Sequence, residues 1–219
     1  MAATKKDLWS AAIEAFEDGS HAVLERVCRA LLEHEPENFP VRMLLAHALL
    51  KMKRFPEAGD LLEGANPSDE RTLVLWHRTT GDYYVERGDH EAAEDEYASA
   101  LAIADAMSSD LVLDLVEARI NQGSHEAALR TIETFVARHE HEPLDDRELL
   151  AFAKARVLRN LGRFEQALVA AREAEGLGRE LGGFPGCEAL ITDLEARLAW
   201  DARLPASQAR VELDADSPE

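Results

Sequence analysis

The sequence is poor in aromatic residues and cysteine, and it contains no long apolar run. Aromatic side chains make up 6% of the 219 residues, and β-branched residues are sparse beside Ala and Leu, so we predict no β-strand. Cys28 and Cys187 lie among apolar neighbours, which predicts reduced, buried thiols rather than a disulfide framework or a zinc site. No uninterrupted apolar stretch approaches the roughly 20 residues of a membrane span. Because Met1–Lys6 also lack the apolar core of a signal peptide, we expect a soluble, cytoplasmic protein.

Basic residues are outnumbered by acidic ones. The chain has 24 Lys and Arg against 43 Asp and Glu, which gives a net charge of −19. Residues 61–140 are the most acidic part, with 17 acidic and six basic side chains. A strongly negative potential repels phosphate backbones and anionic lipid headgroups, so we expect no nucleic-acid partner and no membrane partner. The acidic surface is interpreted as a solubilising one, or as one selected for basic partners or for high salt.

The sequence carries no motif of a known catalytic site. It has no phosphate-binding loop, no nucleophile elbow, no His-Glu-x2-His helix and no paired Cys-x2-Cys. The glycine-rich stretch 182–186 follows a predicted helix and is interpreted as a linker. His139 and His141, with Asp145 and Asp146 nearby, form the most metal-like string. No further His or Cys lies close in sequence, so we interpret the string as an exposed loop. We therefore predict no enzyme, no metal site and no cofactor.

A short turn cassette recurs along the chain at a nearly constant period. Its first turn residue is Gly19, Lys53, Gly88, Gly123 or Gly162, which gives steps of 34, 35, 35 and 39 residues. Such a period is typical of a helical repeat array. Each period holds two amphipathic segments and therefore predicts a helix hairpin. His residues also recur at one position near the start of the second helix, which argues for a shared local role. Small residues, which let the two helices cross closely, follow the turn at Ala58, Ala93, Ala128 and Ala167.

These spacings resemble the tetratricopeptide repeat family. The best match is the third unit, where Gly81-x2-Tyr84 and Ala93-x3-Tyr97 reproduce the family pattern of Gly, aromatic, Ala and aromatic. The second unit departs from the pattern, with Lys53 at the turn. The resemblance implies an all-α, right-handed superhelical solenoid of about five helix hairpins plus a C-terminal capping helix. We predict one solenoid over residues 1–202, with hairpins at about 4–36, 38–66, 70–107, 109–140 and 145–182, a capping helix at 187–202 and a flexible acidic tail at 203–219.

The resemblance also implies that the first helices of successive hairpins line a concave groove. Along this groove the predicted surface begins apolar, becomes acidic and ends with two arginines. The family members that grip a chaperone carboxyl terminus use Lys and Asn at set positions, and here those positions hold apolar residues or Thr79. The predicted partner-binding residues are Trp9, Ile13, Phe16, Met43, His47, Leu50, Arg78, Asp82, Glu86, Asp114, Glu117, Phe152, Arg156 and Arg159.

Two alternatives remain open at these positions. Trp9, Ile13 and Phe16 either anchor a partner or pack against the second hairpin as ordinary core. Arg156 and Arg159 either hold an anion or pair with acidic side chains such as Glu148 and Glu165.

The function implied by the resemblance is that of a non-enzymatic adaptor. We expect it to bind a peptide or helix of a protein partner in the groove, with basic and apolar side chains on the partner. The alternative is a self-associating structural scaffold. A monomer or a weak homo-oligomer fits the adaptor.

Overall fold

The described part of the chain is entirely α-helical. The structure is a computed structural model that describes residues 4–103, 108–139, 146–179 and 186–203. These residues contain no strand, which confirms the predicted all-α class. In chain order, the helices are α1 (Lys5–Glu17), α2 (His21–His34), α3 (Phe39–Lys51), α4 (Phe55–Glu63), α5 (Glu70–Arg87), α6 (His90–Ile103), α7 (Ser109–Asn121), α8 (His125–Arg138), α9 (Arg147–Asn160), α10 (Phe164–Gly178) and α11 (Cys187–Asp201).

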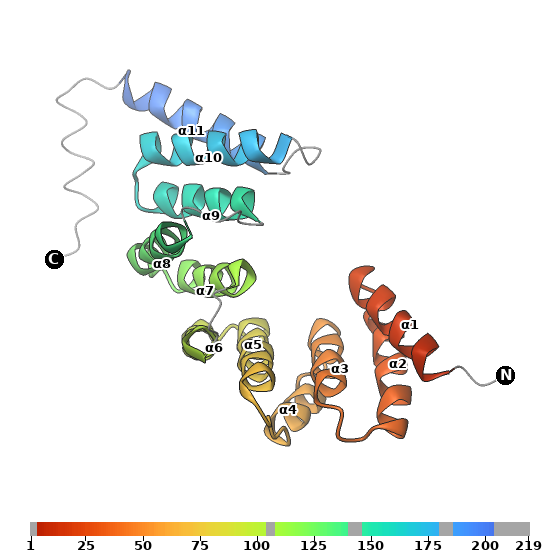
Figure 1. The fold of residues 1–219 in the computed structure, drawn as a ribbon. Coiled ribbons are helices and arrows are strands. Elements are labelled where there is room, and N and C mark those ends of the chain that lie inside the picture. Colours follow the sequence, from red (N-terminus) through yellow and green to blue (C-terminus); the bar gives the residue numbers. More distant parts are fainter. Residues whose placement is uncertain (1–3, 104–107, 140–145, 180–185, 204–219) are drawn as a thin grey trace. The chain divides into compact units, whose positions relative to one another are not determined.

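The chain divides into two compact units, and each is described by itself. The N-terminal unit is Met1–Gln122 and the C-terminal unit is Gly123–Glu219. In the N-terminal unit α1 packs on α2, α2 on α3, α3 on α4 and α5, α5 on α6, and α6 on α7. In the C-terminal unit α8 packs on α9, α9 on α10, and α10 on α11 (Figure 1). One continuous solenoid over residues 1–202 stays a prediction.

The turns between paired helices have the conformation that the cassette predicts. Gly88 ends α5 in the left-handed region, with φ of 78°, and Lys53 takes the same region at φ of 61° although it carries a side chain. The small residue after each turn, at Ala58, Ala93, Ala128 and Ala167, is fully buried. Close helix crossing therefore holds in the pairs α3 with α4, α5 with α6, and α9 with α10.

The remaining core predictions concern the cysteines and the last helix. Cys28 and Cys187 are free and buried, and burial raises the pKa of the Cys28 thiol to about 11, so this thiol stays protonated at neutral pH. In α11, Leu190 and Leu194 are buried, whereas Asp193 is exposed. This is the amphipathic pattern expected of a helix that packs one face against α10. The predicted tail after residue 203 lies outside the described residues.

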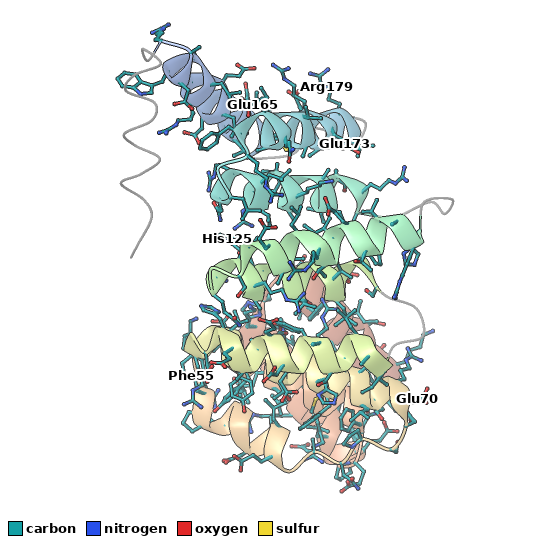
Figure 2. The ribbon with its side chains drawn as sticks, turned by 90° about the vertical axis from the view of Figure 1, so that its left-hand side faces the viewer. Phe55, Glu70, His125, Glu165, Glu173 and Arg179 are labelled. Carbon is teal, nitrogen blue, oxygen red and sulfur yellow. The ribbon has the colours of Figure 1, made fainter. Side chains whose placement is uncertain are left out.

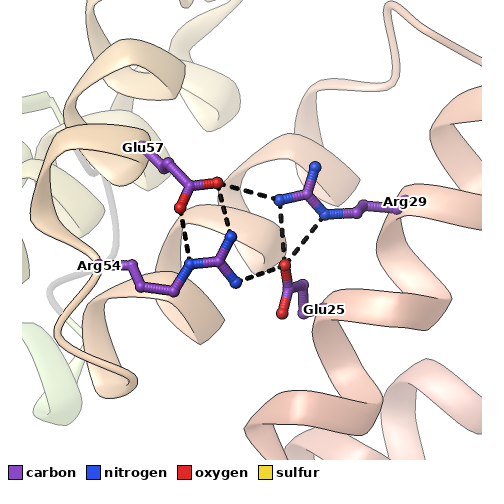
Figure 3. Close-up of polar contacts among 4 residues, drawn as sticks. All are labelled: Glu25, Arg29, Arg54 and Glu57. Atoms are coloured by element: carbon purple, nitrogen blue, oxygen red, sulfur yellow. Dashed lines mark hydrogen bonds and ion pairs between the residues drawn. The ribbon is translucent and has the colours of Figure 1, made fainter.

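An ion-pair network joins α2 to α4 in the N-terminal unit (Figure 3). Arg54, which precedes α4, places Nη1 at 2.6 Å from Oε1 of Glu25 in α2 and Nε at 2.7 Å from Oε1 of Glu57 in α4. Arg29 in α2 closes the network, with Nη2 at 3.2 Å from Oε2 of Glu57. Ion pairs this exposed add little stability, so we interpret the network as fixing how α4 meets α2.

The first residue of α2, α4, α6, α8 and α10 carries an aromatic ring in each case. The position holds Phe55 in α4 and His125 in α8, which Figure 2 labels, and the other members are His21, His90 and Phe164. The predicted shared role of the histidines is thus local, because each begins a different helix. Nδ1 of each of the three imidazoles is buried without a hydrogen-bond partner. Because two of these helices begin with Phe and the histidines of the others lack a hydrogen-bond partner at Nδ1, the position favours an apolar ring.

We therefore expect His90→Phe to raise the stability of the chain. The substitution keeps a ring at the start of α6 and removes a buried nitrogen without a partner, so the free energy of unfolding should increase by about 1 kcal/mol. Urea unfolding followed by circular dichroism measures the change. The reverse substitution, Phe164→His, is the matched control and should lower stability. A loss of stability in His90→Phe would show that the imidazole makes a favourable interaction.

Candidate functional site

A pocket of about 460 Å³ opens in the N-terminal unit between α1, α3, α5 and α7. All of its lining residues lie on the first helices of successive hairpins, where the family resemblance places the groove. Five of the predicted binding residues meet there. The pocket is lined by Phe16, Pro40, Met43, Leu44, His47, Leu75, Arg78, Thr79, Asp82 and Asp110.

One half of the pocket is apolar. Phe16 at the end of α1 is 46% exposed, and its ring centroid lies 5.2 Å from that of His47 in α3. Met43 is buried, and Leu44 and Leu75 are half-buried. An exposed aromatic ring in a pocket that aliphatic side chains also line can anchor an apolar side chain of a partner.

The other half contains a hydrogen-bonded carboxylate. The Tyr97 hydroxyl in α6 donates to Oδ1 of Asp82 in α5 at 2.7 Å, and His47 Nδ1 lies 3.9 Å from Oδ2 of the same carboxylate. Burial, with a further contribution from Asp82, raises the pKa of Tyr97, so its hydroxyl stays protonated and donates. Tyr97 therefore fixes Asp82 through Oδ1, while Oδ2 lies near His47, which also lines the pocket.

Arg78 lies between three carboxylates. Its Nε is 2.9 Å from Oδ2 of Asp114 in α7, and its Nη1 is 3.7 Å from Oδ2 of Asp110. Burial raises the pKa of Asp114 to about 6, with Asp82 and Asp110 adding to the rise and Arg78 opposing it. The lining residues Arg78, Asp82 and Asp110, together with Asp114 behind them, carry one positive and three negative charges when ionised. The pocket wall is thus acidic even with its own arginine in place.

The other predicted residues of the N-terminal unit lie outside this pocket. Trp9 packs against the buried cluster of α1, α2 and α3, which favours the core interpretation for its side chain. Ile13 is 54% exposed on α1. Leu50 is completely buried, so it offers no surface to a partner. Glu117 is half-buried on α7.

Glu86 is paired within the unit. Its carboxylate accepts a hydrogen bond of 2.8 Å from Lys51 and another from Lys53. Lys51 ends α3 and Lys53 lies in the turn after it. The negative charge of Glu86, one of the predicted binding residues, is therefore already balanced within the protein.

Phe152, Arg156 and Arg159 come together in the C-terminal unit. They line a pocket of about 340 Å³ between α9 and α11, together with Gly186, Ala189, Leu190 and Asp193. Nη1 of Arg159 lies 4.0 Å from Oδ2 of Asp193, an acidic side chain other than Glu148 and Glu165, the examples that the sequence offered. We keep as a prediction that a single partner contacts both this pocket and the pocket of the N-terminal unit.

The metal-like string receives no support from its described members. His139 Nδ1 lies 2.9 Å from the carbonyl oxygen of Phe135, and their rings pack at 4.5 Å. His141 and Asp145 lie outside the described residues. Within the described ranges no three His, Cys, Asp or Glu side chains are placed to hold a metal ion.

Part of the pocket lies outside the sequence prediction. Pro40 lines the pocket without being among the predicted residues, and Tyr97, a residue of the repeat pattern, also holds Asp82. Pro40 lies one turn before Leu44 on α3, so helical spacing could have found it. The contact between Tyr97 and Asp82 joins two helices and has no signal in the sequence.

Hairpins whose first helices line a pocket define a repeat protein of the α-solenoid class. A tetratricopeptide repeat family model matches residues 11–78. Together with the structural similarities below, this match supports a tetratricopeptide repeat fold for the chain.

Solved tetratricopeptide structures share the fold at low sequence identity. A thermophilic protein of Thermus thermophilus matches with a TM-score of 0.66 and 16% identity, over 90% of this chain and 100% of that one. A tetratricopeptide repeat protein of Parabacteroides merdae matches with a TM-score of 0.62 and 14% identity, over 98% of this chain and 80% of that one. No curated protein matches the chain in sequence.

A further similarity is to a larger protein. The Cut9–Hcn1 structure of the APC/C matches with a TM-score of 0.69 and 12% identity over 89% of this chain, which spans 37% of the length of the matched chain. These likenesses establish the fold. Tetratricopeptide repeats generally mediate protein–protein interaction or scaffolding and are typically non-enzymatic modules. Among the described helices, none has both the length and the apolar character that crossing a membrane requires.

Proposed function

We propose that this chain is a non-enzymatic, cytoplasmic adaptor that binds a segment of a protein partner in the pocket between α1, α3, α5 and α7. The observation that supports the proposal most is the pairing of an exposed aromatic ring, Phe16, with the acidic wall of Asp82 and Asp110 in one pocket. Such a surface complements a segment with an apolar side chain beside a lysine or arginine. It disfavours nucleic acid and anionic membranes, because both are negative.

The test uses the full chain and a defined probe. The probe is a short amphipathic peptide with leucine on one face and lysine on the other, and a matched peptide carries glutamate in place of lysine. Fluorescence anisotropy should show tighter binding of the lysine peptide. Phe16→Ala should weaken that binding by about tenfold, because it removes an exposed anchor from the pocket. Helical content should stay unchanged.

Val23→Ala is the matched control. Val23 is 39% exposed on α2 and does not line the pocket, so its truncation should leave peptide affinity unchanged. Equal affinities of Phe16→Ala and the unsubstituted chain would overturn the proposal. Trp9 is unsuitable for this test because it packs against the core.

Self-association is the second candidate, and the exposure of Ile13 and Phe16 one turn apart on α1 favours it. Apolar side chains exposed together can pair between two copies of a chain. Sedimentation equilibrium over a range of micromolar concentrations separates the two functions. A monomer at every concentration removes the scaffold, whereas a dimer that Phe16→Ala dissociates supports it.

A further inference from the structure

Asp114 is the carboxylate that lies next to Arg78 without lining the pocket. It lies on α7, and its Oδ2 atom is buried. The nearest cation is Arg78 of α5, whose Nε is 2.9 Å away. Asp114 is therefore a half-buried carboxylate whose one close cation also lies near Asp110.

The charged and titratable groups around Asp114 come from three helices. Asp110 lies one turn earlier on α7, Arg78 and Asp82 come from α5, and the Tyr97 hydroxyl comes from α6. His47 of α3 lies beyond them against Asp82. Three carboxylates thus share one guanidinium, which stays charged because arginine does not lose its proton in proteins.

We propose that a proton on Asp114 competes with the basic side chain of the bound segment, so that the pocket holds its partner at neutral pH and releases it on acidification. This inference rests on the proposed function. A cation in the pocket favours the ionised form of every nearby carboxylate. By linkage, a ligand that favours the ionised form binds more tightly when that form predominates.

Protonation of Asp114 also changes what Arg78 does. With Asp114 neutral, the guanidinium loses the charge of its closest carboxylate and is left with Asp110 and Asp82, the two carboxylates that line the pocket. The wall that faces a lysine or arginine then carries less net negative charge. The raised pKa of Asp114, at about 6 through burial, places this change between neutral and mildly acidic pH.

The binding experiment compares the full chain with Asp114→Asn, which mimics the neutral carboxyl. We expect the affinity of the unsubstituted chain for the lysine peptide to fall about fivefold to tenfold between about pH 7.5 and about pH 5.5. Asp114→Asn should bind weakly and equally at both pH values. It keeps His47, so pH dependence that survives in this variant belongs to other groups and overturns the assignment to Asp114.

A second measurement needs no ligand. A carboxyl whose folded-state pKa lies above its unfolded value binds a proton more strongly when folded, so it stabilises the fold as pH falls from about 6 toward about 4. As the pH falls from about 6 to about 4, the free energy of unfolding of the unsubstituted chain should increase relative to that of Asp114→Asn. If the relative stability does not change, the proton switch is wrong and the adaptor stands. If the relative stability rises but the lysine peptide does not bind at about pH 7.5, the proposed adaptor function is wrong. The proton switch is then wrong as well, because it rests on that function.

Discussion

Gly81→Ala will lower the free energy of unfolding of the N-terminal unit by about 3 kcal/mol, the cost expected for overpacking a buried position. Gly81 lies inside α5, where a Cβ atom would come within 2.5 Å of Cε1 and 2.8 Å of Cδ1 of Tyr97. The Tyr97 ring is 3% exposed, and its hydroxyl is held by Asp82. The ring cannot move away from the added methyl group without breaking that hydrogen bond, so the steric clash is not relieved at no cost.

Gly176→Ala is the matched control for this prediction. Gly176 also lies inside a helix, α10, and beyond its chain neighbours and the nearby backbone of that helix no heavy atom lies within 4 Å of a Cβ at its position. Alanine has the higher helix propensity, so this variant should gain about 0.5–1 kcal/mol. Urea unfolding measures both changes. The double variant Gly81→Ala with Tyr97→Leu should recover part of the loss, because it removes the ring atoms that clash. Independent effects of the two substitutions would contradict the packing argument.

The periodic features of the fold were predictable from the sequence. Left-handed turn residues and small crossing residues recur every thirty-odd positions, and each depends on local conformation or helix contact within one hairpin. Even the exception was predictable, because the cassette around Lys53 keeps its spacing without glycine. The division at Gln122 was not predictable, since the turn at Gly123 carries the same cassette as the others.

The candidate site was predicted in outline, and its electrostatics were not. Helical spacing placed Phe16, His47 and Asp82 on first helices, and the pocket brings them together. The spacing could not show that Lys51 and Lys53 neutralise Glu86, because those side chains reach across from the preceding hairpin. It also placed Leu50 one turn after His47, although the helix rotates Leu50 into the core.

We expect Asp110→Lys to weaken binding of the lysine peptide by roughly 30-fold, or about 2 kcal/mol. Asp110 is exposed in the first turn of α7 and lines the pocket. Reversing its charge removes an attraction and adds a repulsion, each worth about 1 kcal/mol for partly solvated charges a few ångströms apart. The same change should improve binding of the glutamate peptide, which a loss of fold cannot do. Fluorescence anisotropy with both peptides measures how far the variant loses affinity for the lysine peptide and gains affinity for the glutamate peptide.

Asp60→Lys on α4 separates a local effect from a global one. Asp60 is exposed and does not line the pocket, so this variant changes the net charge of the chain by the same amount. At about 0.15 M salt, charges farther apart than roughly 8 Å are largely screened, and Asp60→Lys should alter peptide affinity less than twofold. If both variants weaken binding equally, the peptide responds to the overall charge of the protein, and the acidic wall at Asp82 and Asp110 does not select the partner.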